Sequence, residues 1–150
     1  MFDIELLDSF DVEIIFRLGL ATALGSLIGY EREAKNRPAG LRTNMLVCLG
    51  AAIFTIVSIS FEEDPIRIAA GIVTGIGFLG AGSIISSKEK VKGLTTAATL
   101  WIVAAIGLSV GSGFYVIGIV SAVMVFIILQ IGHIEKKGYG KRDGDEKHDL

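Results

Sequence analysis

The stretch that decides the fold is GLTTAATLWIVAAIGLSVGSGFYVIGIVSAVMVFIILQIG, residues 93–132, which has no Asp, Glu, Lys, Arg or His in 40 consecutive positions. As a single helix it would extend about 60 Å, twice the roughly 30 Å hydrocarbon core of a bilayer. The Gly-Ser-Gly at 111–113 lies near its middle, where the chain can turn. We therefore predict two antiparallel transmembrane helices, at 93–110 and 114–131.

The rest of the chain repeats this pattern, with apolar stretches of spanning length at 14–30, 44–61 and 65–87. Overall, 51% of residues are apolar and 20% are charged, against about 25% charged in soluble domains, and the mean hydropathy is +0.63. Together with the uncharged run, these values exclude a water-soluble globular enzyme. Backbone groups in lipid must bond within their own element, and the alternating pattern of a barrel is missing. The predicted fold is all-α, with five transmembrane helices.

The segments between the spans give the orientation, because Lys and Arg accumulate on the cytoplasmic side of a membrane protein. Segments 31–43, 88–92 and 132–150 hold four, three and five basic residues, whereas segments 1–13, 62–64 and 111–113 hold none. We therefore predict that the N-terminus lies outside and the C-terminus lies in the cytoplasm.

The two ends of the chain and its few cysteine and histidine residues add further expectations. The N-terminal segment lacks the positive charge of a signal peptide, so the first helix is expected to stay in the mature protein. Residues 1–131 are predicted to form one transmembrane domain and 132–150 a disordered cytoplasmic tail. Cys48 stands alone, and His133 and His148 are isolated, so no disulfide or metal site is predicted from them. We predict no cofactor and no nucleic-acid partner.

Eight acidic residues fall on the predicted outer side, five in segment 1–13 and three at Glu62, Glu63 and Asp64. Two interpretations stay open, a solvated acidic face or weak binding of Mg²⁺ or Ca²⁺ through carboxylate oxygens. The five spans themselves contain no Asp or Glu, which argues against a pathway for ions or protons. Asp64 before Pro65 is typical of the start of a helix.

Glycines in the spans are interpreted as helix-packing positions, because small residues one turn apart let another backbone approach. The predicted packing positions are Gly25, Gly29, Gly71, Gly75, Gly77, Gly80 and Gly82, and the pair Gly107 and Gly111 has the same spacing. Residues 75–80 also match the letters of a dinucleotide-binding motif. That motif requires a strand turning into a helix, so we reject a nucleotide site inside this apolar span.

Arg17 and Arg67 are the two basic residues inside or at the edge of a span. Each follows an acid by four residues, Glu13 and Glu63 respectively, in the order that supports a helical ion pair. They are either interface arginines that extend to the membrane surface or a shared functional cluster on the outer side.

The densest polar cluster lies between the first two spans, around a turn formed by Pro38 and Gly40. A plain membrane loop needs only positive charge, yet this one also carries two acids. We therefore predict a fixed polar network that either holds the helix ends or docks a partner, built from Glu31, Arg32, Glu33, Arg37, Arg42 and Asn44.

Five sequence segments in order carry a family resemblance: RLGLA at 17–21, GSLIGYERE at 25–33, RPAGLRTN at 37–44, GIGFLGAG at 75–82 and KGLTTAATLW at 92–101. The sequence thereby resembles the MgtC/SapB family of bacterial and archaeal inner-membrane proteins. The family's motif residues match at Arg17, Glu31, Arg32, Arg37, Gly40, Arg42, Gly77, Gly80, Gly82, Thr95, Thr96 and Trp101. The family often has His at the position of Asn44. Longer members also carry a soluble ACT-like domain, so functions that need that domain are not expected to transfer.

The resemblance implies a link to magnesium limitation and, in pathogens, to survival inside macrophages. It favours a non-enzymatic regulator of other membrane proteins, including the proton ATP synthase, within the lipid bilayer. The alternative is a transporter or channel for Mg²⁺ or another divalent cation, and a homo-oligomer stays open. The sequence assigns no metal ligands.

Overall fold

The protein is helical apart from one very short hairpin in a computed structural model that describes residues 9–60, 65–86 and 91–139. The helices are α1 (Ser9–Ala34), α2 (Leu41–Ser60), α3 (Pro65–Gly82), α4 (Leu94–Gly111) and α5 (Tyr115–Tyr139). Strands β1 (Ile85–Ser86) and β2 (Val91–Lys92) pair in antiparallel fashion between α3 and α4, with Ile85 opposite Lys92.

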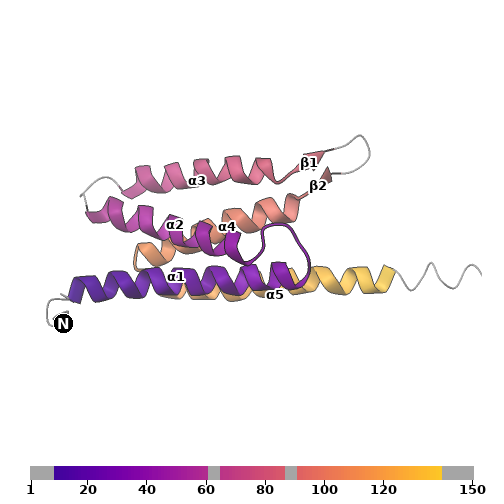
Figure 1. Ribbon diagram of the computed structural model, residues 1–150, viewed down its shortest axis with the longest axis horizontal. Helices are drawn as coiled ribbons and strands as arrows, with labels where there is room; N and C mark the ends of the chain where they lie inside the picture. The colour runs from indigo at the N-terminus through magenta and orange to yellow at the C-terminus, as the bar shows by residue number, and fades with distance from the viewer. Residues whose placement is uncertain (1–8, 61–64, 87–90, 140–150) are drawn as a thin grey trace, which may run out of the picture.

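The helices lie along the long axis of the molecule in three layers (Figure 1). Helix α3 forms one outer layer, α2 and α4 form the middle, and α1 with α5 forms the other outer layer. Helix α1 packs against α2, α4 and α5, whereas α3 packs against α4 and α2. The short hairpin and the turn between α1 and α2 lie at the same end of the molecule (Figure 1).

The core lies where α1, α2 and α4 meet. Ile28, Cys48, Val103, Ile106 and Val110 are almost fully buried there. The outward faces are also apolar: Phe78 is 83% exposed and Val116 is 74% exposed. A surface this rich in large apolar side chains suits lipid or another helix better than water.

Three helical segments are long and apolar enough to cross a membrane: Asp11–Ala34, Leu41–Ser60 and Leu94–Gly111. Two shorter apolar helices, Ile66–Gly82 and Tyr115–Ile131, accompany them. The all-helical architecture is thus confirmed, whereas five spans and their direction remain predictions.

The turn predicted at 111–113 is confirmed, since α4 ends at Gly111 and α5 begins at Tyr115. Two other boundaries differ from the approximate ones that the sequence predicts. Helix α3 ends at Gly82 rather than at 87, because the chain enters the short hairpin. Helix α5 continues to Tyr139, so the segment expected to be disordered from 132 is helical in its first part. Residues 140–150 lie outside the described residues.

The glycine predictions divide into two groups. A Cβ atom added to Gly25 would lie 2.8 Å from the backbone carbonyl oxygen of Asn44, and one added to Gly29 would lie 2.7 Å from the Leu41 Cα. Gly111 meets the backbone of Ala52 on the other side of α2. Helix α2 therefore packs directly against glycines of both α1 and α4, as the spacing predicts.

The glycines of α3 do not follow this prediction. A Cβ added to Gly71, Gly75, Gly77 or Gly82 would have no neighbour within 4 Å, and one added to Gly80 would reach only ordinary contact with Ala97 at 3.6 Å. The small residues of α3 face open space because no described helix covers that side.

Candidate functional site

Arg17 binds three helices together at the end of the molecule where α1 begins. Its Nη1 donates to the Gly111 carbonyl over 2.7 Å, and its Nε donates to the Tyr115 hydroxyl over 3.2 Å. Its Nη2 forms a short ion pair with Glu13, which also accepts a 2.9 Å hydrogen bond from the Tyr115 hydroxyl. We name Arg17, Glu13, Tyr115 and the Gly111 carbonyl the arginine clamp.

The clamp explains why an arginine is placed here. The carbonyls in the last turn of α4 have no partner within the helix and carry its negative dipole end. Arg17 satisfies one of them, and its guanidinium also lies 5.9 Å from the centre of the Tyr115 ring. The predicted Glu13–Arg17 pair is therefore present, and its geometry is that of a structural fastener.

Arg67 occupies a different environment. It lies at an apolar groove of about 580 Å³ between α2 and α3. Its expected partner Glu63 and the helix cap Asp64 lie outside the described residues. Among the residues the structure describes, none of the partners of Arg17, which are Glu13, Gly111 and Tyr115, lines the groove at Arg67, so the two arginines share no common cluster there.

At the opposite end, α1 ends in a turn that is fixed by backbone hydrogen bonds. The Arg37 N–H donates to the Arg32 carbonyl and the Asn36 N–H to the Glu33 carbonyl, both over 2.9 Å. Asn36 has a left-handed φ of 51°. This is a Schellman motif with Asn at the position that glycine usually occupies.

Two members of the predicted polar cluster hold this turn. The Glu33 carboxylate accepts a 2.8 Å hydrogen bond from the Leu41 N–H at the start of α2. The buried Asn44 amide donates to the carbonyls of Ala39 and Gly40, over 2.6 and 2.9 Å. Glu33 and Asn44 thus fix the helix ends, one of the two roles that the sequence left open.

Glu31 and Arg32 are each only 4% exposed, but they do not pair with each other. Glu31 pairs with Lys35 over 2.5 Å, and its Oε2 has no hydrogen-bond partner. The Arg32 Nη2 donates to the Thr96 hydroxyl at 2.7 Å and to the Pro38 carbonyl at 3.3 Å. The Arg32 Nε has no partner. Two adjacent residues therefore each keep a buried polar atom without a partner, an acceptor in Glu31 and a donor in Arg32.

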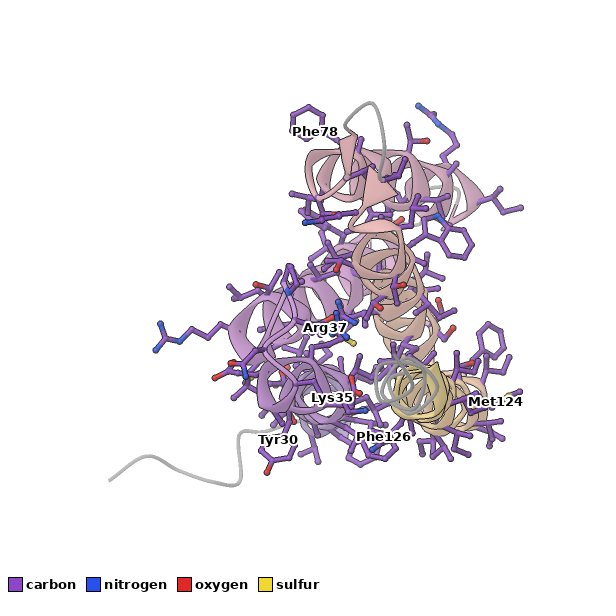
Figure 2. The ribbon with its side chains drawn as sticks, turned by 90° about the vertical axis from the view of Figure 1, so that its right-hand side faces the viewer. Tyr30, Lys35, Arg37, Phe78, Met124 and Phe126 are labelled. Atoms are coloured by element: carbon purple, nitrogen blue, oxygen red, sulfur yellow. The ribbon has the colours of Figure 1, made fainter. Side chains whose placement is uncertain are left out.

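These side chains line a cavity of about 720 Å³ between α1, the start of α4 and the second half of α5. We name it the basic cavity. Lys35 and Arg37 point toward the middle of the molecule, whereas Tyr30, Phe78 and Met124 point outward (Figure 2). The polar side chains that line it are Glu31, Arg32, Lys35, Arg37, Lys92, Thr95 and Thr96.

The start of α4 at this cavity depends on a glycine. Gly93 has a φ of 92°, and a Cβ there would collide with the Ser83 backbone carbonyl. No side chain caps the helix at this position, although the Gly93 carbonyl accepts a bond from the Ala97 N–H at 2.9 Å. In the part of the chain that the structure describes, the N–H groups of the first turn of α4 therefore have no capping side chain.

The structure divides the six residues of the predicted cluster. Glu31, Arg32 and Arg37 line the basic cavity, Glu33 and Asn44 support the turn, and Arg42 is exposed on α2 away from the cavity. Lys92 was missed as a site residue, although a lysine and a glycine before an apolar helix could have indicated it. Among the described residues, no group of three His, Cys, Asp or Glu side chains could hold a metal ion.

These features define a class: a helical protein with apolar outer faces, a structural arginine clamp at one end and a basic cavity at the other. The sequence profile of the MgtC family matches residues 18–136, and the chain belongs to the MgtC family of membrane proteins.

Several relatives show the same membership. The chain is 52% identical over 110 residues to protein MgtC of Brucella abortus (strain 2308), covering 72% of this chain and 45% of that protein. It is 45% identical over 131 residues to YhiD of Escherichia coli (strain K12), whose name proposes a magnesium transporter. The match covers 81% of this chain and 61% of that protein. It is 39% identical over 132 residues to protein SapB of Bacillus subtilis (strain 168), covering 81% and 56%.

The chain therefore spans about half to three-fifths of the length of these curated relatives. No solved structure matches it.

Proposed function

We propose that this protein is a non-enzymatic regulator of other membrane proteins that acts through helix contacts in the inner membrane of a bacterium or archaeon. In this proposal all five helices span the bilayer, the N-terminus lies outside, and the basic cavity opens toward the cytoplasm. The resemblance names the proton ATP synthase as one partner and low magnesium as the condition of action.

The observation that supports this proposal most is the buried apolar layer between the two polar ends. Ile28, Val103, Ile106 and Val110 are at most 1% exposed and fill the space between the arginine clamp and the basic cavity. Threonines at this depth are bonded to their own helices: Thr22 donates to the Leu18 carbonyl at 2.7 Å. A path for ions needs carboxylates or unwound carbonyls at this depth.

The exposed side of α3 supports the proposed contact with helices of other membrane proteins. Its open glycines at 71, 75 and 77 and the apolar groove beside them leave room for a helix of another membrane protein.

The alternative is a transporter or channel for Mg²⁺ or another divalent cation. The name given to the Escherichia coli relative favours it. In that case the ion path would have to form between several copies of the chain, since the core of one chain is packed with apolar side chains.

Proteoliposomes that contain the purified chain and a Mg²⁺-sensitive dye distinguish the two functions. We expect Mg²⁺ entry no faster than the leak of empty vesicles, and specific membrane proteins recovered with the chain after mild detergent extraction. A saturable Mg²⁺ flux that requires the protein would overturn the regulator proposal.

The membrane orientation has its own measurement. The native Cys48, which is fully buried, is first replaced. Single cysteines introduced at Glu63 and at Gly138 then report on opposite sides of the membrane in the proposed orientation. An impermeant thiol reagent should label only the first in intact cells, and labelling of both would contradict five spans.

A further inference from the structure

We propose that the basic cavity binds a phosphate group, either the diester of an anionic lipid headgroup or the phosphate of a soluble compound. This inference goes beyond the proposed function, since it stands whether the protein regulates or transports.

The charges around the cavity call for an anion. Among the described residues, Arg32, Lys35, Arg37 and Lys92 bring four positive charges to its wall, against one negative charge from Glu31, which is paired with Lys35. Among the described residues, no carboxylate lies within ion-pair distance of Arg32.

Arg32 provides the observation that points most directly to a missing ligand. Its side chain is 96% buried in the cavity wall, being 4% exposed, and its Nε has no hydrogen-bond partner. A buried guanidinium whose neighbouring acid, Glu31, is already paired with Lys35 is costly, because its desolvation is only partly offset. An anion in the cavity would supply both the charge and the acceptor.

The start of α4 adds a second anion-binding element from a different part of the chain. Among the described residues no side chain caps its first turn, and Thr95 and Thr96 of that turn line the cavity. Free N–H groups and the positive dipole end of a helix favour phosphate. The β1–β2 pairing brings Lys92 to the same place.

The shape and the remaining walls favour phosphate with an attached organic group. A volume of about 720 Å³ is far larger than a bare anion needs and is typical of small-molecule sites. Val91, Leu94, Ile128 and Leu129 make part of the wall apolar. The tetrahedral arrangement of phosphate oxygens suits donors that converge from α1, the turn and α4.

Two binding measurements on the purified full chain test the proposal and separate the two sources. In the first, radiolabelled inorganic phosphate is equilibrated with the protein in a neutral detergent. In the second, native mass spectrometry counts phosphatidylglycerol adducts against phosphatidylcholine adducts on protein offered equal amounts of both lipids.

Exposed residues provide the variants, so that folding is preserved. Arg37→Gln and Lys92→Gln each remove one charge from the cavity wall, and Arg42→Gln removes one from the exposed start of α2, outside the cavity. We expect each cavity variant to weaken binding about tenfold, because charge-assisted hydrogen bonds are lost. Arg42→Gln should stay within about twofold of the unmodified protein.

Each outcome decides something. Selective phosphatidylglycerol adducts that the cavity variants lose assign the site to a lipid headgroup, and phosphate binding that they lose assigns it to a soluble phosphate compound. Absence of binding in both measurements overturns the proposal. So does a loss in Arg42→Gln as large as in the cavity variants, since that result reports only diffuse surface charge. Mg²⁺ flux is measured separately, so either proposal can fail alone.

Discussion

Arg17 lies in the first half of α1 and Arg32 in its last turn, and their surroundings are opposite in kind. All three guanidinium nitrogens of Arg17 have partners, and one of these partners is an acid. Arg32 is more deeply buried, yet its Nε has no partner and its neighbouring acid pairs with a lysine. A satisfied arginine holds helices together, whereas an unsatisfied one beside a cavity indicates a ligand.

The largest loss of stability is expected from a larger side chain at the contact between α1 and α2, because α1 carries both arginines. Gly29→Leu would force side-chain atoms into the backbone of α2, since a Cβ there already lies 2.7 Å from the Leu41 Cα. We expect a loss of about 3 kcal/mol in stability, measured by thermal unfolding in detergent.

Gly75→Leu is the matched control for this substitution, because a Cβ at Gly75 has no neighbour within 4 Å. It should leave the unfolding temperature of the single chain unchanged. Equal losses in both variants would show that α1 and α2 do not touch at Gly29.

The second prediction removes Arg17, the arginine whose guanidinium nitrogens all have partners. Arg17→Met keeps the length of the side chain but removes its bonds to the Gly111 carbonyl and the Tyr115 hydroxyl. We expect a loss of about 2 kcal/mol, because a charged donor is lost and a helix-end carbonyl is left without it. Thermal unfolding should show a clear decrease, and an unchanged value would mean that the clamp is not a fastener.

Arg32→Met makes the same substitution at the arginine that lacks an acid partner, and we expect it to have the smallest effect on stability. Two hydrogen bonds are lost, but so is the cost of a buried charge without an acid partner. We expect the ligand-free protein to change by less than about 1 kcal/mol, although Arg32 is the more buried arginine. A loss as large as that of Arg17→Met would remove the distinction between the two ends.

Local sequence predicted the parts of the fold that depend on composition and short-range turns. The uncharged run at 93–132 predicts both helices and the turn between them, because charge and glycine content act locally. The polar cluster between the first two helices was also found from sequence, because acids and arginines around Pro38 and Gly40 are unusual in a membrane loop.

Other features depend on contacts that sequence spacing does not contain. Spacing puts Gly71 and Gly75 on one helix face, but only tertiary packing decides whether that face meets a neighbour. Tyr115 reaches Arg17 across 98 positions of chain. Lys92 reaches the cavity through strands of two residues, which are too short to produce a readable alternation.

The glycine contacts on both sides of α2 limit how this molecule can move. Gliding between packed helices normally uses side chains that adjust as they slide past each other. Gly25 and Gly29 on α1 and Gly107 and Gly111 on α4 instead press backbone against backbone, which leaves nothing to adjust. We therefore expect α1, α2 and α4 to shift as one unit, and α3, whose glycines make few close contacts, to have more freedom to tilt.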